Sequence, residues 1–458
     1  MKFTSDDIKK ALNVEIEHDG SFEISTDTRT IKKGDLYLPL KGANFDGEDF
    51  CDKALESGAA GCFYTKQKPC DFAIKVDDTL TAYLKLANYM RRKINPIVVG
   101  VTGSSGKTTT KEMIYSVLSE KFLTHKTFSN HNNEIGFCQT VLSMPENCEV
   151  LIVEMGMRGL GEIELITKYA EPDYAVITNA GSAHIGRLGS LDNIAKAKCE
   201  ITKYLKSALI AHNNDRIKKF ANFDGEKVFY SINDVEILDK KEGYSKFLYK
   251  DKEYELNIEG DYNVENSLSA INLGYKLGMS YEEIKSGLSK YKPIEKRWEI
   301  QNVNGYNIIN DSYNANPESM KAAVSTFLDL YKNPVVVLGN MGELGEDEID
   351  FHKQVGKYIA EKYPKTDAKF ITVGNLASQI GKELITKNLN VKTFDDNIET
   401  SRYILDNLHG DCTIFLKASR AMKFEEIIDY IKNVNKTGAS ANENLSNTDE
   451  VSKKRSDW

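Results

Sequence analysis

The chain has 458 residues, a hydrophobic fraction of 41%, a charged fraction of 28% and a formal net charge of −8 at pH 7. This length exceeds one ordinary domain and predicts about three, and the composition is typical of a globular protein. The acidic balance and the lack of a polybasic block argue against nucleic acid and anionic membranes as partners, so an anionic substrate would have to be held by local clusters of charge.

Cysteine usage and the N-terminal segment predict an intracellular protein. The seven cysteines form no Cys-x-x-Cys pair, and their odd number suits a reducing compartment better than a disulfide framework. Residues 1–7 lack the apolar core of a signal peptide. No apolar run approaches the ~18 residues of a membrane span. We therefore expect a cytoplasmic protein.

Residues 1–79 are predicted to form a small mixed α/β unit. It should contain a strand at 36–40 and a helix from Phe50 to Ser57. Two loops carry residues that could grip a diphosphate and a base, although a local salt bridge and turn chemistry are the alternative favoured by these residues alone. The loop residues are Thr26, Asp27, Arg29, Phe45, Asp46 and Gly47.

The next feature is a phosphate-binding pattern. A helical linker is predicted from Thr79 to Lys93, and the β-branched run 97–102 then predicts a strand, a Gly-rich turn and a helix. Unpaired backbone N–H groups and the positive helix end at such a turn face an anion. The turn and first helical residues are Gly103, Ser104, Ser105, Gly106, Lys107, Thr108 and Thr109.

This pattern predicts a nucleoside triphosphate. Lys107 is expected to reach the β- and γ-phosphates, and the Thr108 hydroxyl to hold Mg²⁺. The strict eight-residue motif requires glycine five positions before Gly106, where this chain has Val101. The shorter form leaves an ordinary strand–helix turn with a capping threonine as the alternative.

Polar residues follow the later strands of the central unit, which we assign to residues 80–294. Asn132 and Asn133 lie in an amide-rich segment predicted as a turn, whose amides can also contact phosphate or a carboxylate. Glu154 ends a predicted buried parallel strand, where a carboxylate beside a phosphate loop either holds Mg²⁺ or is merely solvated. His184 takes the same position after the next strand, with a structural histidine as its alternative.

The remainder of the central unit is less specific. A helix at 194–201 has two lysines that would ordinarily be solvated, and a β-hairpin insert is predicted from about Glu226 to Ile258. Asn263 and Asn266 share one face of the first turn of the following helix. Helix capping and contacts to a purine edge are both compatible with that spacing.

Residues 295–435 again alternate strands and helices, which predicts a smaller doubly wound sheet, and the tail 436–458 is expected to be disordered. The predicted fold class is α/β with three domains: a small N-terminal α/β domain, a central parallel-sheet domain like that of P-loop ATPases, and a C-terminal Rossmann-like domain. The strands predicted in the last domain are 335–339, 370–374, 391–394 and 412–417.

Together these stretches resemble the Mur ligases of bacterial cell-wall synthesis. The family-level motifs are residues 102–112, the Glu154 strand, Ala183-His184, Ala197-Lys198-Cys199-Glu200 and Asn263-x-x-Asn266. The segments 130–136, 311–320 and 339–345 resemble the member that adds a D-alanyl-D-alanine dipeptide, and the Asp-Asn-Pro-Arg signature of the sibling that adds a diamino acid is absent. The shorter phosphate loop is also the form that this family uses.

The resemblance implies ATP-dependent joining of D-alanyl-D-alanine to a UDP-N-acetylmuramoyl-tripeptide through an acyl phosphate, giving a pentapeptide precursor of peptidoglycan. It implies Lys107, His184 and Lys198 as catalytic residues and two Mg²⁺ ions. The metal ligands would be Thr108 and Glu154 for the first ion and His184 for the second, with Lys198 carbamylated beside them.

The same resemblance extends to the other ligands. ATP would also contact Asn263, Asn266, Arg297, Asp311 and Tyr313, and Asn132 and Asn133 would contact substrate. The uridine diphosphate would be bound by the six N-terminal loop residues, and the dipeptide by Ser419 and Arg420. We expect a monomer whose domains close on the ligands.

Other functions are also compatible with parts of the sequence. Another Mur-type amide ligase or a folylpolyglutamate synthetase-like enzyme fits the central motifs, but the segment 311–320 disfavours both. A regulatory nucleotide switch or partner-binding ATPase would leave Glu154, His184 and Lys198 without a task. The third residue of the tripeptide can be lysine or a diaminopimelate.

Overall fold

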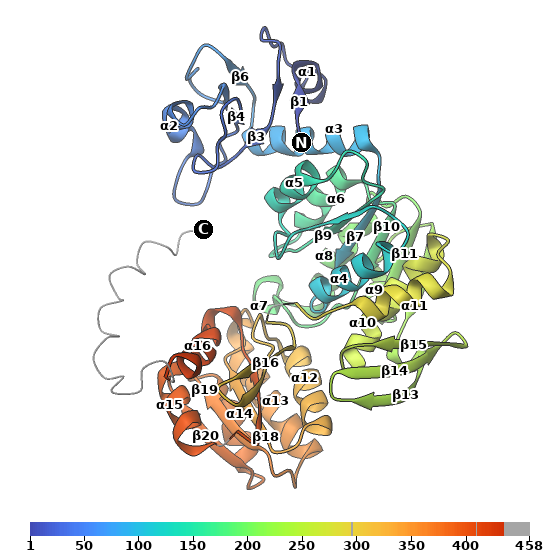
Figure 1. The fold of residues 1–458 in the computed structure, drawn as a ribbon, viewed down its shortest axis with the longest axis vertical. Coiled ribbons are helices and arrows are strands. Elements are labelled where there is room, and N and C mark those ends of the chain that lie inside the picture. Colours follow the sequence, from blue (N-terminus) through green and yellow to red (C-terminus); the bar gives the residue numbers. More distant parts are fainter. Residues whose placement is uncertain (295, 409, 435–458) are drawn as a thin grey trace. The chain divides into compact units, whose positions relative to one another are not determined.

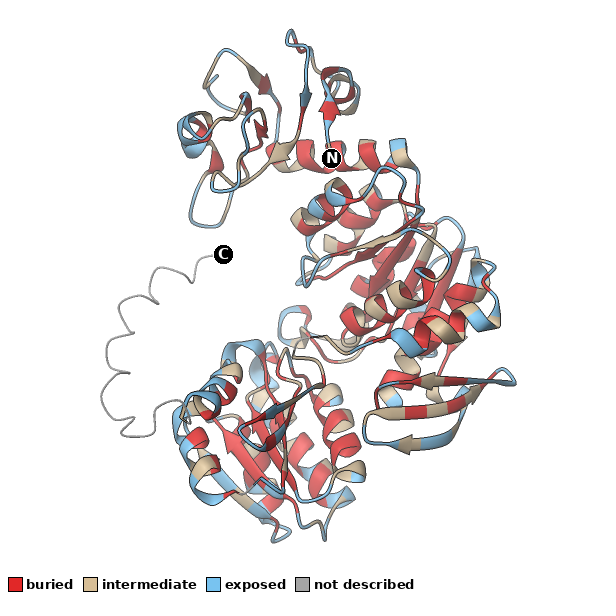
Figure 2. Cartoon of the chain, in the orientation of Figure 1, coloured by how far each residue is buried: buried red, intermediate tan, exposed pale blue. Residues whose placement is uncertain are grey.

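The computed structural model describes residues 1–294, 296–408 and 410–434, and these form two compact units, Met1–Tyr291 and the chain from Lys292 onward (Figure 1). Figure 2 shows buried residues concentrated in the strands of the sheets and on one side of the helices. The predicted disordered tail, 436–458, lies outside the described residues. None of the described helices has the length and apolar character needed to cross a membrane.

The first unit begins with a two-stranded antiparallel sheet, β1-β2, which is followed by a small parallel sheet in the strand order β3-β4-β5-β6. The predicted strand and helix are confirmed with tighter bounds, because β4 covers Leu36–Tyr37 and a 3₁₀ turn precedes the helix at Cys51–Glu56. The elements are β1 (Phe3–Thr4), α1 (Ser5–Leu12), β2 (Ser21–Phe22), β3 (Ile24–Ser25), β4, η1 (Gly47–Phe50), α2 (Cys51–Glu56), β5 (Gly61–Tyr64) and β6 (Ala73–Lys75).

The helix predicted as a linker is α3, Thr79–Ile94. The Asp78 side chain caps its start by accepting from the Thr81 N–H (2.7 Å), and Asn95 ends it in a left-handed conformation before Pro96. The linker interpretation is wrong, because half of its 16 residues are buried and it packs against α1, α5 and α6. The helix is therefore part of the packed core of the first unit.

A six-stranded parallel sheet, in the order β12-β11-β10-β7-β9-β8, forms the centre of the first unit. Its inner strands are nearly continuous β-branched and apolar runs, as expected for strands covered on both faces. The strands are β7 (Ile97–Thr102), β8 (Thr124–Lys126), β9 (Val150–Glu154), β10 (Tyr174–Ile177), β11 (Ala208–His212) and β12 (Glu226–Tyr230). The helices are α4 (Lys107–Leu118), α5 (Glu134–Ser143), α6 (Glu162–Ala170), α7 (Ile185–Leu188), α8 (Leu191–Cys199), η2 (Glu200–Thr202), α9 (Asp215–Phe220), α10 (Asp261–Lys276) and α11 (Tyr281–Lys290).

The strand order places a topological switch at β7. The chain runs from β7 to the edge strand β8, returns to β9 beside β7, and then crosses to β10 on the other side of β7. Ligands of open α/β sheets bind outside the carboxyl ends of the strands at such a point. The residues after β7, β9 and β10 therefore define the candidate site.

The predicted hairpin insert is a three-stranded antiparallel sheet that starts later than expected. Its strands are β13 (Val235–Lys241), β14 (Tyr244–Tyr249) and β15 (Lys252–Leu256), with a 3₁₀ turn η3 at Ile232–Asp234. Residues 226–230, which we predicted to belong to the insert, are instead β12 and pair parallel with β11. An exposed edge strand and the first strand of an insert share the same alternating pattern, so the sequence did not separate them.

The second unit contains a mostly parallel sheet in the order β16-β17-β21-β18-β19-β20, and all four predicted strands are confirmed. Ile414 and Leu416 of β21 share a core with residues of α15 and α16, whereas Phe415 stacks on Phe327 of α12 at 5.2 Å, so helices cover both faces. The elements are β16 (Glu299–Val303), β17 (Tyr306–Asn310), α12 (Pro317–Leu330), β18 (Pro334–Gly339), η4 (Gly345–Asp347), α13 (Glu348–Lys362), β19 (Lys369–Val373), α14 (Ala377–Ile385), β20 (Asn390–Phe394), α15 (Asn397–Asn407), β21 (Thr413–Lys417), η5 (Arg420–Met422) and α16 (Glu425–Val434).

The hairpin β16–β17 was not predicted. Its turn, Asn304-Gly305, has positive φ at both residues (52° and 88°), as a two-residue hairpin turn requires. The Asn-Gly pair was the available signal. The alternation around it was obscured by asparagines at 302 and 307, which pair with each other across the two strands.

Candidate functional site

The phosphate loop lies between β7 and α4 and is shaped around two glycines. Gly103 has φ 155°, and a Cβ there would lie 1.9 Å from Oγ1 of Thr178. Gly106 has φ 77°, and a Cβ there would lie 2.6 Å from Oδ1 of Asn266. The loop therefore reaches this path only with glycine at both positions.

Two backbone amides of the loop, those of Ser104 and Ser105, converge on Asn179. The Ser104 and Ser105 N–H groups donate to Oδ1 of Asn179 at 3.1 and 2.9 Å. Thr178 Oγ1 donates to the Ser105 carbonyl (2.6 Å), and Lys107 Nζ donates to the Gly103 carbonyl (2.8 Å). Asn179 Oδ1 accepts hydrogen bonds from these amides in the way that a phosphate oxygen would.

Glu154, at the end of β9, faces the loop. Its side chain is 1% exposed, and Oε1 accepts from Thr108 Oγ1 at 3.2 Å and from Asn132 Nδ2 at 2.9 Å. The predicted Thr108 and Glu154 metal ligands are thus adjacent hard oxygen donors, which fit Mg²⁺. Thr109 is buried in the same first turn of α4.

The two asparagines of the amide-rich segment have different surroundings. Asn132 contacts Glu154, and its carbonyl accepts from the Gly156 N–H at 2.7 Å. Asn133 caps α5, because its Oδ1 accepts from the Gly136 N–H at 2.9 Å. Only Asn132 is brought to the predicted metal site through a side-chain contact.

Lys198 is a fully buried lysine on α8. Its Nζ has no hydrogen-bond partner among the described residues. The pKa of Lys198 is held well below its ordinary value, mainly by burial and secondly by the nearby charge of Lys107. Glu162 and Glu200 act in the opposite direction. The neutral amine is therefore favoured at this position.

His184 follows β10 and is half-buried. It has a left-handed backbone (φ 67°) and begins α7, with its carbonyl accepting from the N–H groups of Arg187 and Leu188. Sparsely populated conformations of this kind cluster at functional sites. In the described part of the chain, no three His, Cys, Asp or Glu side chains gather closely enough to hold a metal ion, so the predicted set depends on a hydroxyl and a modified lysine as well.

The predicted adenine ligands on α10 are placed differently. Asn266 lies against Gly106 of the loop. Asn263 is 2% exposed, and its Nδ2 donates to the Glu259 carbonyl at 2.7 Å. Asn266 is therefore at the loop, whereas the Asn263 amide is held within its own helix start.

The N-terminal loops follow two neighbouring parallel strands, β3 and β4. Asp27 pairs with Arg29 (2.6 Å), and this hydrogen bond lowers the pKa of Asp27. Asp46 caps η1 and pairs with Lys66 at 2.5 Å. The Asp27–Arg29 contact is local, as the alternative interpretation of the loops expected, whereas Lys66 follows β5, 20 residues from Asp46. Thr26 is half-buried, Phe45 is 39% exposed, and Gly47 is buried against the backbone of Leu40.

The second unit holds another group of predicted residues. The Arg297 guanidinium lies 3.9 Å from the ring centre of Tyr313. Asp311 accepts from Lys417 Nζ at 2.6 Å, and Lys417 is 3% exposed. These residues come together at the carboxyl ends of β17 and β21.

The predicted dipeptide residues lie just beyond β21. The Ser419 N–H donates to the Asn340 carbonyl at 3.0 Å, and Ser419 is buried. Arg420 is exposed and pairs with Glu425 at 3.2 Å. Asn340 also caps α14 by accepting from the Ala377 N–H at 2.8 Å, so it links the loops after β18, β19 and β21.

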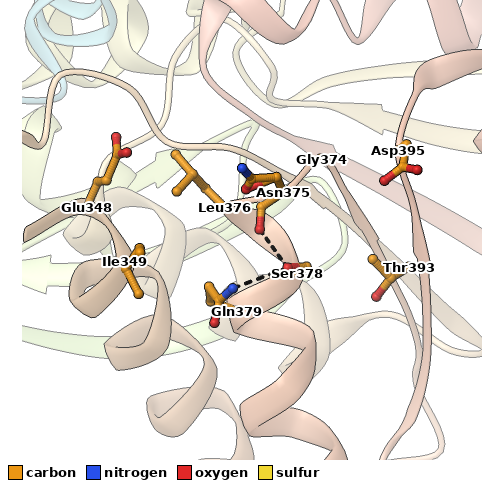
Figure 3. Close-up of a pocket in the computed structure, with 9 residues that line it drawn as sticks. All are labelled: Glu348, Ile349, Gly374, Asn375, Leu376, Ser378, Gln379, Thr393 and Asp395. Atoms are coloured by element: carbon orange, nitrogen blue, oxygen red, sulfur yellow. Dashed lines mark hydrogen bonds between the residues drawn. The ribbon is translucent and has the colours of Figure 1, made fainter.

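A pocket of about 500 Å³ lies at the carboxyl ends of β19 and β20 (Figure 3). None of the described residues that line it belongs to the predicted site. The first amides of α14 beside it are already satisfied by Asn340, Gly374 and Leu376, so they offer no anion site. The lining residues are Glu348, Ile349, Gly374, Asn375, Leu376, Ser378, Gln379, Thr393 and Asp395.

Three residues that hold parts of the predicted site in place had no role predicted from the sequence. Asn179 and Thr178 hold the phosphate loop, and Lys417 holds Asp311. Their positions directly after β10 and at the end of β21 were the available signal. Their contact partners could not be predicted, because a position at the carboxyl end of one strand does not specify which neighbouring strand supplies the contact.

Three family models match the chain: Mur ligase family, catalytic domain, over residues 23–98; Mur ligase middle domain, over 101–274; and Mur ligase, glutamate ligase domain, over 296–420. Together they cover most of the chain, including the phosphate loop, Glu154 and Lys198. The chain belongs to the Mur ligase family.

Within this family, the chain is 38% identical over 425 residues to the UDP-N-acetylmuramoyl-tripeptide–D-alanyl-D-alanine ligase of Bacillus subtilis (strain 168), covering 88% of this chain and 92% of that protein. It is also similar to a crystal structure of MurF from Acinetobacter baumannii, with a TM-score of 0.86 and 27% identity, covering 94% and 99% of the two chains. A crystal structure of MurF from Thermotoga maritima in complex with ADP has a TM-score of 0.80 and 27% identity over 90% and 98%.

Proposed function

We propose that this chain is the ATP-dependent ligase that joins D-alanyl-D-alanine to a UDP-N-acetylmuramoyl-tripeptide, with release of ADP and phosphate. The observation that carries the proposal is the buried Thr108–Glu154 pair beside a glycine-shaped phosphate loop, in a chain 38% identical to a relative with that name. The product is the pentapeptide precursor of peptidoglycan.

The reaction suits a site built for positioning. A carboxylate oxygen of the tripeptide attacks the γ-phosphorus, and the bond to the ADP oxygen breaks, giving an acyl phosphate and ADP. The dipeptide amine then attacks the acyl carbon, loses a proton, and expels phosphate from the tetrahedral intermediate. Catalysis consists mainly of aligning the reactants and neutralising charge.

In this proposal, residues of the first unit align the phosphates and neutralise their charge. Lys107 binds the β- and γ-phosphates, and the loop amides now held by Asn179 take phosphate oxygens. Thr108 and Glu154 would hold one Mg²⁺, and His184 and a modified Lys198 would hold a second. When bound, Mg²⁺ withdraws charge from the phosphate oxygens.

Lys198 acts as a carbamate in this proposal. The neutral amine attacks CO₂, a nitrogen–carbon bond forms, one C=O pair moves to oxygen, and the amine loses a proton to solvent. The product has two oxygen donors that share one negative charge, which suit a hard cation. The complete burial and unsatisfied Nζ of Lys198 support this assignment, since an ammonium there would be uncompensated.

A pair of variants on α8 tests the carbamate. Lys198→Ala should lose activity, and short carboxylic acids should restore part of it by supplying the missing oxygen ligands. Lys196→Ala is the matched control, because Lys196 is exposed on the same helix, over the Phe220 ring. Full activity of untreated Lys198→Ala would refute the carbamate.

The remaining ligands are assigned by resemblance, and the contact of Asn132 with Glu154 and the place of Asn266 beside Gly106 support two of them. Asn263, Asn266, Arg297, Asp311 and Tyr313 complete the ATP site, and Asn132 and Asn133 contact the peptide substrate. Thr26, Asp27, Arg29, Phe45, Asp46 and Gly47 bind the uridine diphosphate, and Ser419 and Arg420 the dipeptide.

The domain assignment has the same basis. We infer a UDP-muramoyl-binding domain at 1–79, an ATP-binding domain at 80–294 and a domain for nucleotide closure and dipeptide binding at 295–435. We also infer a cytoplasmic monomer.

Phosphate release from the purified protein tests the function. It should depend on ATP, Mg²⁺, the muramoyl-tripeptide and D-alanyl-D-alanine together, because the amine is the acceptor. Parallel reactions with the lysine and diaminopimelate tripeptides identify the preferred third residue. Hydrolysis that does not require the amine would favour a nucleotide switch instead.

A further inference from the structure

Lys111 is a fully buried lysine that the proposed chemistry does not use. It lies in α4 three residues after Thr108, and none of its side chain is exposed. Its Nζ donates to the carbonyls of Thr127 (2.8 Å) and Ser129 (3.0 Å). A buried ammonium is stable only where anionic groups and hydrogen-bond acceptors surround it. The residues around Lys111 therefore indicate its role.

Those surroundings include the carboxylate of the metal site. Lys111 Nζ lies 3.4 Å from Oε2 of Glu154, the oxygen that accepts no hydrogen bond from any residue the structure describes. The other oxygen, Oε1, accepts from Thr108 and Asn132. The two oxygens of Glu154 therefore have different surroundings. Oε1 is directed to the phosphate loop, and Oε2 faces the ammonium of Lys111.

Lys111 also lies beside the carboxylate of its neighbour, Glu112. Glu112 Oε1 also lies 3.4 Å from Lys111, but Oε2 of Glu112 pairs with Lys126, which sits 3.9 Å from the Tyr115 ring centre. Two cations thus balance two carboxylates. Lys111 remains held between Glu154 and the two carbonyls.

The carbonyl contacts connect Glu154 to the amide-rich segment. Thr127 and Ser129 precede Asn132 by a few residues, and the Thr127 hydroxyl accepts from the Glu154 N–H at 3.0 Å. Lys111 therefore fixes both the metal carboxylate and the start of the segment that brings Asn132 to it. Groups that orient metal ligands in this way are as important to affinity as the ligands.

We propose that Lys111 is a positioning residue that orients Glu154 toward Thr108 and thereby sets the affinity of the nucleotide site for Mg²⁺. The inference rests on the proposed function for the presence of Mg²⁺ at this site. It assigns Lys111 no contact with the phosphates or the ion.

Calorimetric titration of ADP, with Mg²⁺ and separately with a chelator, tests this role without any turnover. In Lys111→Met, ADP affinity with the chelator should stay within about twofold of wild type, because Lys107 and the loop amides are intact. The tightening of ADP binding by Mg²⁺ should fall by about 10–100-fold, as is typical when a group supporting a metal ligand is lost.

Lys121→Met is the matched control, since Lys121 is an exposed lysine just after α4 whose amine donates to the Gly278 carbonyl (2.6 Å), and it should keep the full Mg²⁺ effect. Lys111→Arg retains the charge and should recover part of the effect, and it replaces Lys111→Met if that variant does not fold. A folded Lys111→Met with unchanged, or stronger, Mg²⁺ tightening would overturn the proposal. Absence of any Mg²⁺ effect in wild type would instead overturn the nucleotide–metal site of the proposed function.

Discussion

The buried imidazole of His352 ties the segment 339–345 to α13. Nε2 accepts from the Met341 N–H at 2.9 Å, and Nδ1 lies 2.6 Å from the Glu348 carbonyl, to which it must donate. This pattern requires the neutral ring, because an N–H at Nε2 would face another donor. Burial accordingly lowers the pKa of His352.

We therefore expect the second unit to lose stability in acid. The unfolded histidine, with a pKa near 6.5, binds a proton more readily than the folded one, so the stabilisation is complete above about pH 6.5 and is lost as the pH falls toward the lower folded pKa. The loss can reach at most about 1.4 kcal/mol per pH unit, the limit for one titrating group, and should be absent in His352→Gln. Hydrogen-exchange protection of α13 between pH 8 and 5 measures it, and equal slopes in both proteins would contradict it.

Gly103 gives a second prediction at this scale. Gly103→Ala combines a disfavoured φ of 155° with a Cβ 1.9 Å from Thr178 Oγ1, so the loop must change its path. ADP binding should weaken by at least about tenfold, since such strain costs on the order of 1–3 kcal/mol. Gly159→Ala, whose Cβ would meet only Glu162 Oε1 at 3.5 Å, is the control and should bind ADP normally. Calorimetry provides the comparison.

Among the elements, α5 depends on Asn133 for its start. Asn133→Ala should destabilise the protein by about 1 kcal/mol, because the Gly136 N–H loses its acceptor, whereas Asn133→Ser should retain most of the cap. Thermal unfolding measures this difference. The proposed contact of Asn133 with substrate predicts a raised KM in both variants, and an unchanged KM in Asn133→Ser would leave it only the capping role.

The sequence predicted those elements whose pattern is local. Apolar β-branched runs located β7, β9 and β18, and the carboxyl-end position of Glu154 predicted its approach to Thr108. The hairpin β16–β17 and the edge strand β12 were missed or misassigned, because half-exposed strands carry mixed polar patterns. Burial of α3 could not be predicted either, since it depends on α1, α5 and α6 packing around it.

Contacts between side chains were harder to predict than positions. Asn179, Lys417 and Lys111 each act through a partner on another strand or helix. Such partners follow from strand order, and strand order is a property of the assembled sheet. Conversely, Asn263 and Asn133 had the predicted locations, but local capping contacts occupy their amides.

For the whole molecule, the proposed ATP ligands are divided between the two units. Gly103–Thr109 and Asn266 belong to the first, and Arg297, Asp311 and Tyr313 to the second. We predict that the units close on ATP, so an ATP analogue with the muramoyl substrate should reduce the radius of gyration measured by solution scattering. Arg297→Ala should bind the nucleotide through the loop with a smaller reduction. An unchanged radius in wild type would count against closure.

The position of β21 in the second sheet has a consequence for biosynthesis. This strand is the last of the sheet to be made, yet it lies between β17 and β18 and pairs with both. Until residue 417 has emerged from the ribosome, the two earlier strands have no neighbour between them and expose unpaired backbone edges. The strands described for the first unit all lie before residue 257 and pair with one another. The two units should therefore mature one after the other during translation, and a ribosome that stalls before Thr413 would present a folded first unit beside an aggregation-prone second one.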